Sequence, residues 1–409
     1  MLNINVVYLG TSEHVALRRG DVRIVWSGAP LPDCDLYAYL GAYSFFGRRP
    51  GPQVLVQGEP VVTQPREFTG EILQHFDHVL TLLDSLDGIT PQISRWVLPA
   101  CLMEPISEPP PTFSELSELY PTEGRRDAIC MISGNKTSPI PGELYSTRVE
   151  IARWFHEQSD IPFDVFGQPA FEDLPNYVRP LGPDEKLTVL AGYRYSLCME
   201  NSYDPFWSRG YITEKLTECL RCRTVPIYLG CSNVEDHIPT ECFIDYREFS
   251  GPADLDGFLR GVDDDKYHAY VDSIDAWLRE GNLSEYHIWR LYDRLTELLV
   301  DAVGGSAAPL WREDTTWTPA SVPDEPPTRD VDADGSLRTW DEMNVAPYWT
   351  WPYLTRTSLD ECVASVESIR KTQTLGPAPR DDDERRREKP KRISRLLYIG
   401  GDYSAPGLL

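Results

Sequence analysis

The chain has 409 residues, 41% of them hydrophobic, and a formal net charge of −25 at pH 7. This length accommodates two domains of ordinary size together with extensions. The acidic charge argues against a general DNA or RNA binder, whose surface would be basic. It keeps the protein soluble, and it is compatible with a local basic site for a phosphorylated ligand.

No apolar run reaches the roughly 20 residues that a membrane-spanning helix needs. The first residues, MLNINVVYLG, have neither a basic start nor the apolar core of a signal peptide. We therefore expect a cytoplasmic protein. Nine cysteines without a secretory signal favour reduced thiols. Cys219, Cys222, Cys231 and Cys242 could be read as a zinc set, but the helix and strands expected around them favour buried apolar cysteines.

The first hundred residues alternate short apolar runs with loops. The runs are NINVVYLG, DVRIVWSG, DLYAYLG, QVLVQGEP and DHVLTLLD. Each has the length of a strand and is bounded by Gly, Pro or Asp, which predicts a buried, mostly parallel sheet. The proline-rich stretch EPISEPPPTFSELSELYPTEGRRD then marks a connection. We expect a first Rossmann-like domain over residues 1–104 and the connection over 105–126.

A second series of strands and helices follows the connection. The expected strands are AICMISGN, PFDVFG, YRYSLCMEN and TVPIYLG, and the helices among them are STRVEIARWFHEQ and YITEKLTECLRC. This alternation predicts βαβ units. Helical segments up to SEYHIWRLYDRLTELLVDAV complete a second domain, predicted over residues 127–305. The fold class is thus α/β, with two domains that face a cleft, and ligands are expected beyond the carboxyl ends of the strands.

Residues 306–409 are expected to be a partly irregular extension whose role the sequence does not indicate. It contains one predicted helix, around TSLDECVASVESIRKTQ, and a mixed-charge run, RDDDERRREKPKR. Acidic and basic residues alternate within that run, which favours a solvated linker or surface helix over a nucleic-acid or membrane contact.

The stretch GYITEK gathers polar side chains of several kinds. If its helix begins near Gly210, then Tyr211, Glu214 and Lys215 share one face at positions i, i+3 and i+4. A helix N-terminus with a lysine suits a phosphate, and Glu214 can accept hydrogen bonds from sugar or ribose hydroxyls. The alternative is a carboxylate in a first helical turn beside a surface lysine. Glu200, at the end of an apolar strand, favours a site because a buried carboxylate without a partner is costly.

Three runs in this order, YRYSLCMENS, YITEKL and VPIYLG, resemble the signature of the α-1,3/α-1,4-fucosyltransferases. The resemblance is clear over about residues 128–250, thinner over 50–85 and absent after about 305. It implies a GT-B-like fold with an N-terminal acceptor domain and a C-terminal donor domain. It also implies transfer of L-fucose from GDP-β-L-fucose to a sugar hydroxyl with inversion at the anomeric carbon.

The resemblance also implies roles for individual residues. Asn201, Tyr211, Glu214 and Lys215 match the positions that hold the donor, with Lys215 at the diphosphate and Glu214 at hydroxyl groups. Arg148 fits best the arginine that follows the first strand of the donor domain in the family. A guanidinium there would stabilise the charge that develops on the leaving diphosphate. An insertion separates Arg148 from that strand, so an ordinary surface arginine is the alternative.

An inverting transfer also needs a general base to take the proton of the acceptor hydroxyl. In the family this is a glutamate after a strand of the N-terminal domain. Here Glu59 follows the strand QVLVQGEP and is the candidate base. The alternative is a loop carboxylate in a turn before Pro60.

The chain departs from the family pattern at two places. The spacing from Asn201 to Tyr211 is about four residues longer than in relatives, and the added residues include Arg209. Met199 stands where the family usually has phenylalanine. Arg209 and Glu200 are further candidates for donor contacts, and the two departures leave a different donor sugar open.

No Asp-x-Asp motif lies near this site, and lysine and arginine can neutralise the diphosphate. We therefore expect no metal and no obligatory cofactor, with GDP-L-fucose as donor substrate and a glycan or glycoconjugate as acceptor. Two other functions stay open: transfer from a different nucleotide sugar, and a catalytically silent carbohydrate-binding protein. An early G-x-G-x-x-G is absent, which argues against a dinucleotide oxidoreductase. The acceptor and the oligomeric state do not follow from the sequence.

Overall fold

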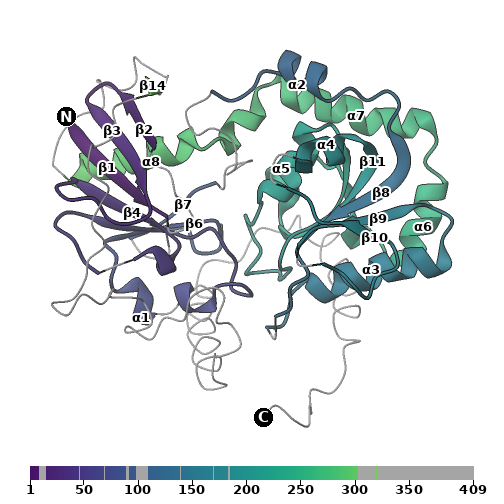
Figure 1. The fold of residues 1–409 in the computed structure, drawn as a ribbon, viewed down its shortest axis with the longest axis horizontal. Helices are drawn as coiled ribbons and strands as arrows, with labels where there is room; N and C mark the ends of the chain where they lie inside the picture. The colour runs from purple at the N-terminus through teal and green to yellow at the C-terminus, as the bar shows by residue number, and fades with distance from the viewer. Residues whose placement is uncertain are drawn as a thin grey trace, which may run out of the picture.

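The computed structural model describes residues 1–8, 15–45, 47–68, 70–88, 92–97, 109–138, 140–168, 170–182, 185–302 and 318–319. Within these ranges the chain forms two sheets with helices packed against them, side by side (Figure 1). The expected α/β class with two Rossmann-like domains is confirmed. The connection predicted over 105–126 is described from residue 109. The predicted helix and charged run of the C-terminal extension lie outside the described residues.

The first sheet has the predicted apolar runs as its central strands. Its described strands, in spatial order, are β14 (Thr318–Pro319), β2 (Val15–Arg19), β3 (Val22–Ser27), β1 (Leu2–Val7), β4 (Leu36–Leu40), β5 (Gln53–Val56), β6 (His78–Thr81) and β7 (Ile93–Arg95). Pairing is parallel from β3 to β7, while β2 and β14 are antiparallel. The short elements of this domain are η1 (Ala42–Ser44), η2 (Pro65–Phe68) and α1 (Gly70–Leu73).

The last described helix, α8 (Trp289–Ala302), returns to the first sheet (Figure 1). Leu291, Leu295 and Leu299 are buried in the same hydrophobic cluster as the side chains of β1, β3 and β4. The indole Nε1 of Trp26 donates a hydrogen bond to Tyr292 Oη over 2.8 Å. The range predicted for the second domain, 127–305, thus includes a helix that belongs by packing to the first. Its amphipathic sequence predicts one buried face but not the sheet that covers it.

The second sheet is parallel throughout its described strands. Their spatial order is β10 (Tyr177–Arg179), β9 (Phe163–Phe166), β8 (Arg126–Ile132), β11 (Tyr193–Met199), β12 (Val225–Leu229) and β13 (Ile244–Asp245). Numbered within the domain, this order is 3-2-1-4-5-6, that of the dinucleotide-binding doubly wound fold. The direction of strand addition reverses between β8 and β11, so the ligand crevice of this fold class lies at their carboxyl ends.

Helices cover both faces of the second sheet (Figure 1). They are α2 (Phe113–Leu119), α3 (Tyr145–Gln158), α4 (Lys186–Ala191), α5 (Glu214–Arg221), α6 (Pro252–Arg260) and α7 (Asp264–Arg279), with the short η4 (Val234–Asp236), η5 (Thr240–Cys242), η6 (Tyr246–Glu248) and η7 (Asn282–Tyr286). On α3, Ala152 and Phe155 are fully buried in the core of the second domain, while Val149 and Trp154 are partly buried against it.

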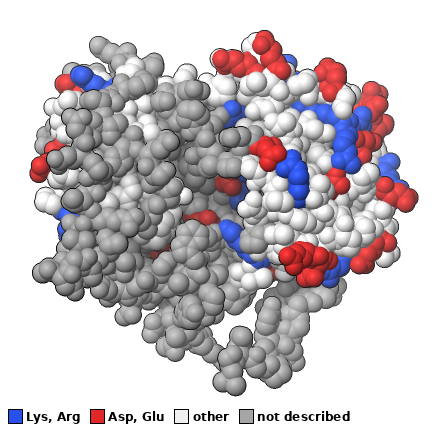
Figure 2. Space-filling model, in the orientation of Figure 1, with Lys and Arg blue, Asp and Glu red and all other residues white. Residues whose placement is uncertain are grey.

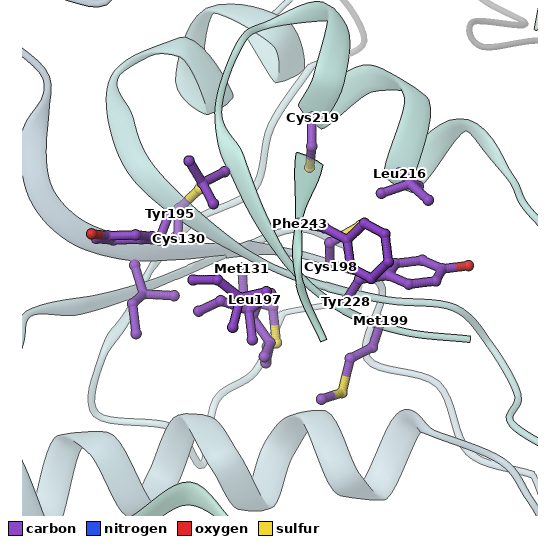
Figure 3. Close-up of a cluster of buried hydrophobic side chains, with 14 of the residues drawn as sticks. Cys130, Met131, Tyr195, Leu197, Cys198, Met199, Leu216, Cys219, Tyr228 and Phe243 are labelled. Atoms are coloured by element: carbon purple, nitrogen blue, oxygen red, sulfur yellow. The ribbon is translucent and has the colours of Figure 1, made fainter. Parts of the chain in front are cut away.

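The four cysteines weighed as a zinc set are buried among apolar side chains of the second domain, as the alternative predicted. Figure 3 shows the Cys219 side chain in this core, with Cys130 and Cys198 from the strands beside it. Burial raises the pKa of Cys231 and Cys242 to about 12, so both thiols stay protonated at neutral pH.

On the face drawn in Figure 2, acidic side chains lie along the outer edge of the second domain, with basic side chains between them. Among the described residues, none of the helices is long and apolar enough to span a bilayer.

Candidate active site

Arg148 lies at the point where the strand order of the second sheet reverses. It comes from α3, and its side chain is 3% exposed. Its Nη1 donates to Ser133 Oγ, after β8, over 2.8 Å, and its Nη2 donates to Met199 O at the end of β11 over 2.7 Å. Nη2 also reaches Glu200 O and Asn201 Oδ1, the latter over 3.1 Å. Arg148 is therefore a buried residue that joins the two strand ends, and the surface alternative is wrong.

Glu200 is fully buried directly after β11. Its carboxylate accepts hydrogen bonds from Thr213 N over 2.8 Å and from Thr213 Oγ1 over 2.7 Å. Burial raises its pKa, while Lys215 lowers it. Gly230 follows β12 and lies against this side chain, because a Cβ at Gly230 would be 2.2 Å from Glu200 Cγ. Residue 230 must therefore be glycine, because any larger side chain would overlap with Glu200.

The helix of GYITEK begins later than its sequence predicts. Thr213 is the N-cap of α5, with an extended backbone and a side chain that accepts from Lys215 N over 3.3 Å, so Glu214 is the first helical residue. The predicted i, i+3, i+4 face that includes Tyr211 is therefore wrong. Gly210 takes a positive φ of 75° and Tyr211 lies before the helix. Its ring is 1% exposed within the hydrophobic cluster of the first domain.

Glu214 and Lys215 open α5 next to Glu200. Lys215 Nζ lies 3.3 Å from Glu214 Oε1 and 3.5 Å from Glu200 Oε2, and it donates to Thr213 Oγ1 over 3.2 Å. Burial acts to raise the pKa of Glu214, but the ammonium groups of Lys215 and Lys186 lower it to about 2. Burial acts to lower the pKa of Lys215, yet Glu214 and Glu200 raise it above its usual value. Both side chains are charged at neutral pH.

Glu59 brings the first domain to this cluster. It follows β5, and its Oε2 accepts a hydrogen bond from Asn201 Nδ2 over 3.2 Å, although the two residues are 142 positions apart. Burial raises the pKa of Glu59, and Lys215 lowers it. The loop after Glu59 makes two further contacts with the second domain. Thr63 Oγ1 lies 3.1 Å from Tyr145 Oη. Ser138 Oγ also donates to the carbonyl of Val62 over 2.8 Å.

Arg209, from the longer loop, does not extend its side chain into this cluster. Its Nη2 lies 3.9 Å from Asp236, and the side chain is 46% exposed. Its carbonyl instead accepts from Asp84 N over 2.9 Å. Asp84 also accepts from Asn233 Nδ2 over 2.9 Å and pairs with Arg95. The Arg209 carbonyl and the Asn233 side chain thus join the second domain to Asp84 of the first.

The structure brings together Glu59, Arg148, Glu200, Asn201, Glu214 and Lys215, all predicted from the sequence. Two neighbours were not predicted. Tyr145 lies against the Arg148 guanidinium, with its ring centroid 5.2 Å away. Lys186, the first residue of α4, pairs with Glu218 on α5. In the sequence Lys186 is only a lysine a few residues before the run YRYSLCMEN.

Comparison with known proteins shows that the segment holding most of this site is similar to a known family. The model described as "Glycosyltransferase family 10 (fucosyltransferase) C-term" matches residues 128–295. A 4-galactosyl-N-acetylglucosaminide 3-alpha-L-fucosyltransferase of Pan troglodytes is 33% identical over 137 residues, which are 33% of this chain and 34% of that relative. A GDP-fucose protein O-fucosyltransferase 3 of Xenopus tropicalis is 31% identical over 156 residues, 35% of this chain and 32% of that protein.

The chain thus spans about a third of the length of these curated relatives. Among solved structures, an alpha1,3-fucosyltransferase with GDP has a TM-score of 0.45 and 17% identity, covering 72% of this chain and 90% of that chain. The segment that matches the family model, residues 128–295, contains Arg148, Asn201, Glu214 and Lys215. Residues 128–295 of this chain are thus similar to the C-terminal domain of glycosyltransferase family 10, the fucosyltransferases.

Proposed function

We propose that the protein is an inverting fucosyltransferase that moves L-fucose from GDP-β-L-fucose to a hydroxyl group of a glycan acceptor. The observation that carries this proposal is the hydrogen bond between Glu59 and Asn201. It joins the candidate base of the first domain to the cluster of the second domain that matches the family model.

In this proposal Glu59 accepts the proton of the acceptor hydroxyl as its oxygen attacks the anomeric carbon of fucose. The new bond forms on the face of the anomeric carbon opposite the phosphate oxygen. The bond between the anomeric carbon and that oxygen breaks, and GDP leaves with its electron pair. A base works best when its pKa approaches the operating pH, and burial raises the pKa of Glu59. This direction supports the assignment.

The negative charge of the departing GDP needs cations. Lys215 supplies an ammonium group at the N-terminus of α5, where free N–H groups also favour an anion. Arg148 adds a second positive charge, and its Nη2 donates a hydrogen bond to Asn201 Oδ1. Glu214 accepts hydrogen bonds from sugar or ribose hydroxyls. With these cations in place, we propose that no metal is obligatory, so EDTA should leave transfer unchanged.

The test combines binding with turnover. Calorimetric titration with GDP, GDP-L-fucose, GDP-mannose and UDP should show selective binding of GDP-L-fucose by the wild type and at least tenfold weaker binding by Lys215→Ala. Glu59→Gln keeps shape and hydrogen bonding but cannot accept a proton. It should retain GDP-L-fucose affinity within about threefold and lose about 10² or more in transfer rate.

The acceptors for this assay are a galactosyl-N-acetylglucosamine disaccharide and its isomers. Transfer at the wild-type rate by Glu59→Gln would refute the base assignment. Tighter binding of another nucleotide sugar would show that GDP-L-fucose is not the donor. Binding of glycans without binding of any guanine nucleotide would support the alternative of a catalytically silent carbohydrate-binding protein.

A further inference from the structure

Tyr145 has no role in the function proposed above, yet its side chain contacts both parts of the candidate site. It is the first residue of α3 and is 4% exposed. Its ring packs against the guanidinium group of Arg148, with 5.2 Å between the ring centroid and Cζ. Its hydroxyl group reaches the first domain, where Tyr145 Oη lies 3.1 Å from Thr63 Oγ1. One tyrosine thus joins Arg148 to the loop that follows Glu59.

The backbone around Tyr145 is fixed to the donor cluster. Leu144 N donates a hydrogen bond to Asn201 O over 3.0 Å. The Glu143 carboxylate accepts from Tyr145 N over 2.7 Å and from Ser146 N over 3.1 Å, which satisfies two of the free N–H groups at the start of α3. These bonds fix the start of α3 relative to Asn201, so the Tyr145 hydroxyl group has a defined position at the boundary between the domains.

The loop after Glu59 is a compact turn. Thr63 N and Gln64 N both donate to Pro60 O over 2.9 Å, which closes the turn directly after Glu59. A shift of Thr63 would therefore move Glu59 with it. Because a displacement of about 1 Å in a reacting group can lower a rate by about 10², a contact that holds Thr63 in place also holds the candidate base.

A tyrosine in this place could instead be an ordinary core residue or a direct contact to the donor. The first alternative accounts for the buried ring, but a core residue of the second domain needs no hydrogen-bond partner in the first. The second alternative is disfavoured, because the hydroxyl group is already bonded to Thr63 and the ring packs against Arg148. The two contacts together favour a residue that links the domains.

We propose that Tyr145 is a positioning residue of the transfer reaction, whose hydroxyl group holds the loop after Glu59 in place against Asn201. This inference rests on the proposed function, because that function assigns the role of base to Glu59. Tyr145 acts through Thr63 and does not react itself. Its effect is that the Glu59 carboxylate meets the acceptor hydroxyl in the geometry that proton transfer needs.

The test measures kcat with the galactosyl-N-acetylglucosamine acceptors, and the Kd of GDP-L-fucose, in the full chain. Tyr145→Phe keeps the ring beside Arg148 and removes the hydroxyl group. It should lower kcat about tenfold and leave the Kd of GDP-L-fucose within about twofold of the wild type. Thr63→Val removes the same hydrogen bond from the other side and should have the same effect. The double variant should also lose about tenfold, because all three proteins lack one and the same hydrogen bond.

Tyr37→Phe is the matched control. Tyr37 is also buried, and its hydroxyl group donates to Leu31 O over 2.9 Å. This bond lies where β4 begins, whereas Glu59 follows the carboxyl end of β5, which is parallel to β4. The control should keep the wild-type kcat although it loses a hydrogen bond of the same kind. Equal losses of kcat in Tyr37→Phe and Tyr145→Phe would overturn the inference, because the effect would then be one of general stability.

Amide hydrogen exchange of the ligand-free proteins tests the loop itself. The amides of residues 61–64 should exchange at least about threefold faster in Tyr145→Phe than in the wild type, and at the wild-type rate in Tyr37→Phe. Unchanged exchange in Tyr145→Phe, a wild-type kcat in that variant, or losses that multiply in the double variant would each overturn the inference. If the wild type transfers no fucose, the proposed function fails, and the exchange rates still decide whether Tyr145 holds the loop.

Discussion

Gly230→Ala should destabilise the second domain strongly, although it adds a single methyl group. The new Cβ would lie 2.2 Å from Glu200 Cγ and 2.6 Å from Glu200 Cβ, where carbon atoms normally keep about 3.5–4.0 Å. Overpacking of this kind costs about 1–3 kcal/mol. Displacing Glu200 also strains its two hydrogen bonds from Thr213, each worth about 1.5–3 kcal/mol for a charged acceptor. We expect a total loss of about 3–5 kcal/mol.

Urea and thermal denaturation followed by circular dichroism will measure this loss, which corresponds to a fall in Tm of roughly 10 °C. Gly257→Ala is the matched control, because a Cβ there meets no atom within 4 Å. Gly257 lies inside α6, where alanine should stabilise by up to about 1 kcal/mol. GDP affinity should fall in Gly230→Ala and stay unchanged in Gly257→Ala. Equal Tm values for the two variants would refute the close-packing argument.

Three further predictions concern ionisable side chains. Arg148→Lys replaces the planar guanidinium group with a single ammonium group, so it should lower the free energy of unfolding, measured by urea denaturation, by about 2–4 kcal/mol. A variant as stable as the wild type would show that the buried hydrogen bonds of Arg148 do not stabilise the domain. Burial raises the pKa of Glu67, a 2% exposed carboxyl, to about 8. Its stabilisation is present below the unfolded pKa and is lost as pH rises through about 8. The free energy of unfolding of Glu67→Gln relative to that of the wild type should therefore rise by on the order of 3 kcal/mol between pH 5 and pH 9. Parallel curves of unfolding free energy against pH for the two proteins would contradict this. Burial acts to raise the pKa of Asp84, but bonds from His237 and Asn233 lower it to about 2. Asp84→Asn should lower Tm above pH 5 and match the wild type near pH 2, whereas an equal loss at both would exclude charge as the cause.

The strands of this fold follow closely from hydrophobic runs. The five runs of the first hundred residues became β1, β3, β4, β5 and β6, and the GYITEK region became a helix between two parallel strands. β2 was not predicted, because VALRR has charged residues where a buried strand would be apolar. In the structure Arg19 is buried and pairs with Asp293 of α8, a partner too distant in sequence to anticipate.

The candidate site was predictable as a set of residues and not as a geometry. Arg148 was assigned to the donor without any indication that its guanidinium binds the carbonyls at the end of β11. Tyr211 was placed on α5, because local spacing does not reveal that Thr213 caps the helix. Lys186 does not stand out in the sequence, because its pairing with Glu218 depends on α4 packing against α5, a tertiary contact that periodicity does not encode.

The return of α8 to the first sheet also determines the order in which the protein can fold during synthesis. The core of the first sheet needs Ile288, Leu291 and Leu295, which leave the ribosome only after the whole second sheet has been made. The second domain is then able to form before the first, against the usual N-to-C order. A fragment that ends at residue 127 would expose the apolar surface that α8 covers and should aggregate. Adding residues 282–302 as a separate peptide should restore its solubility.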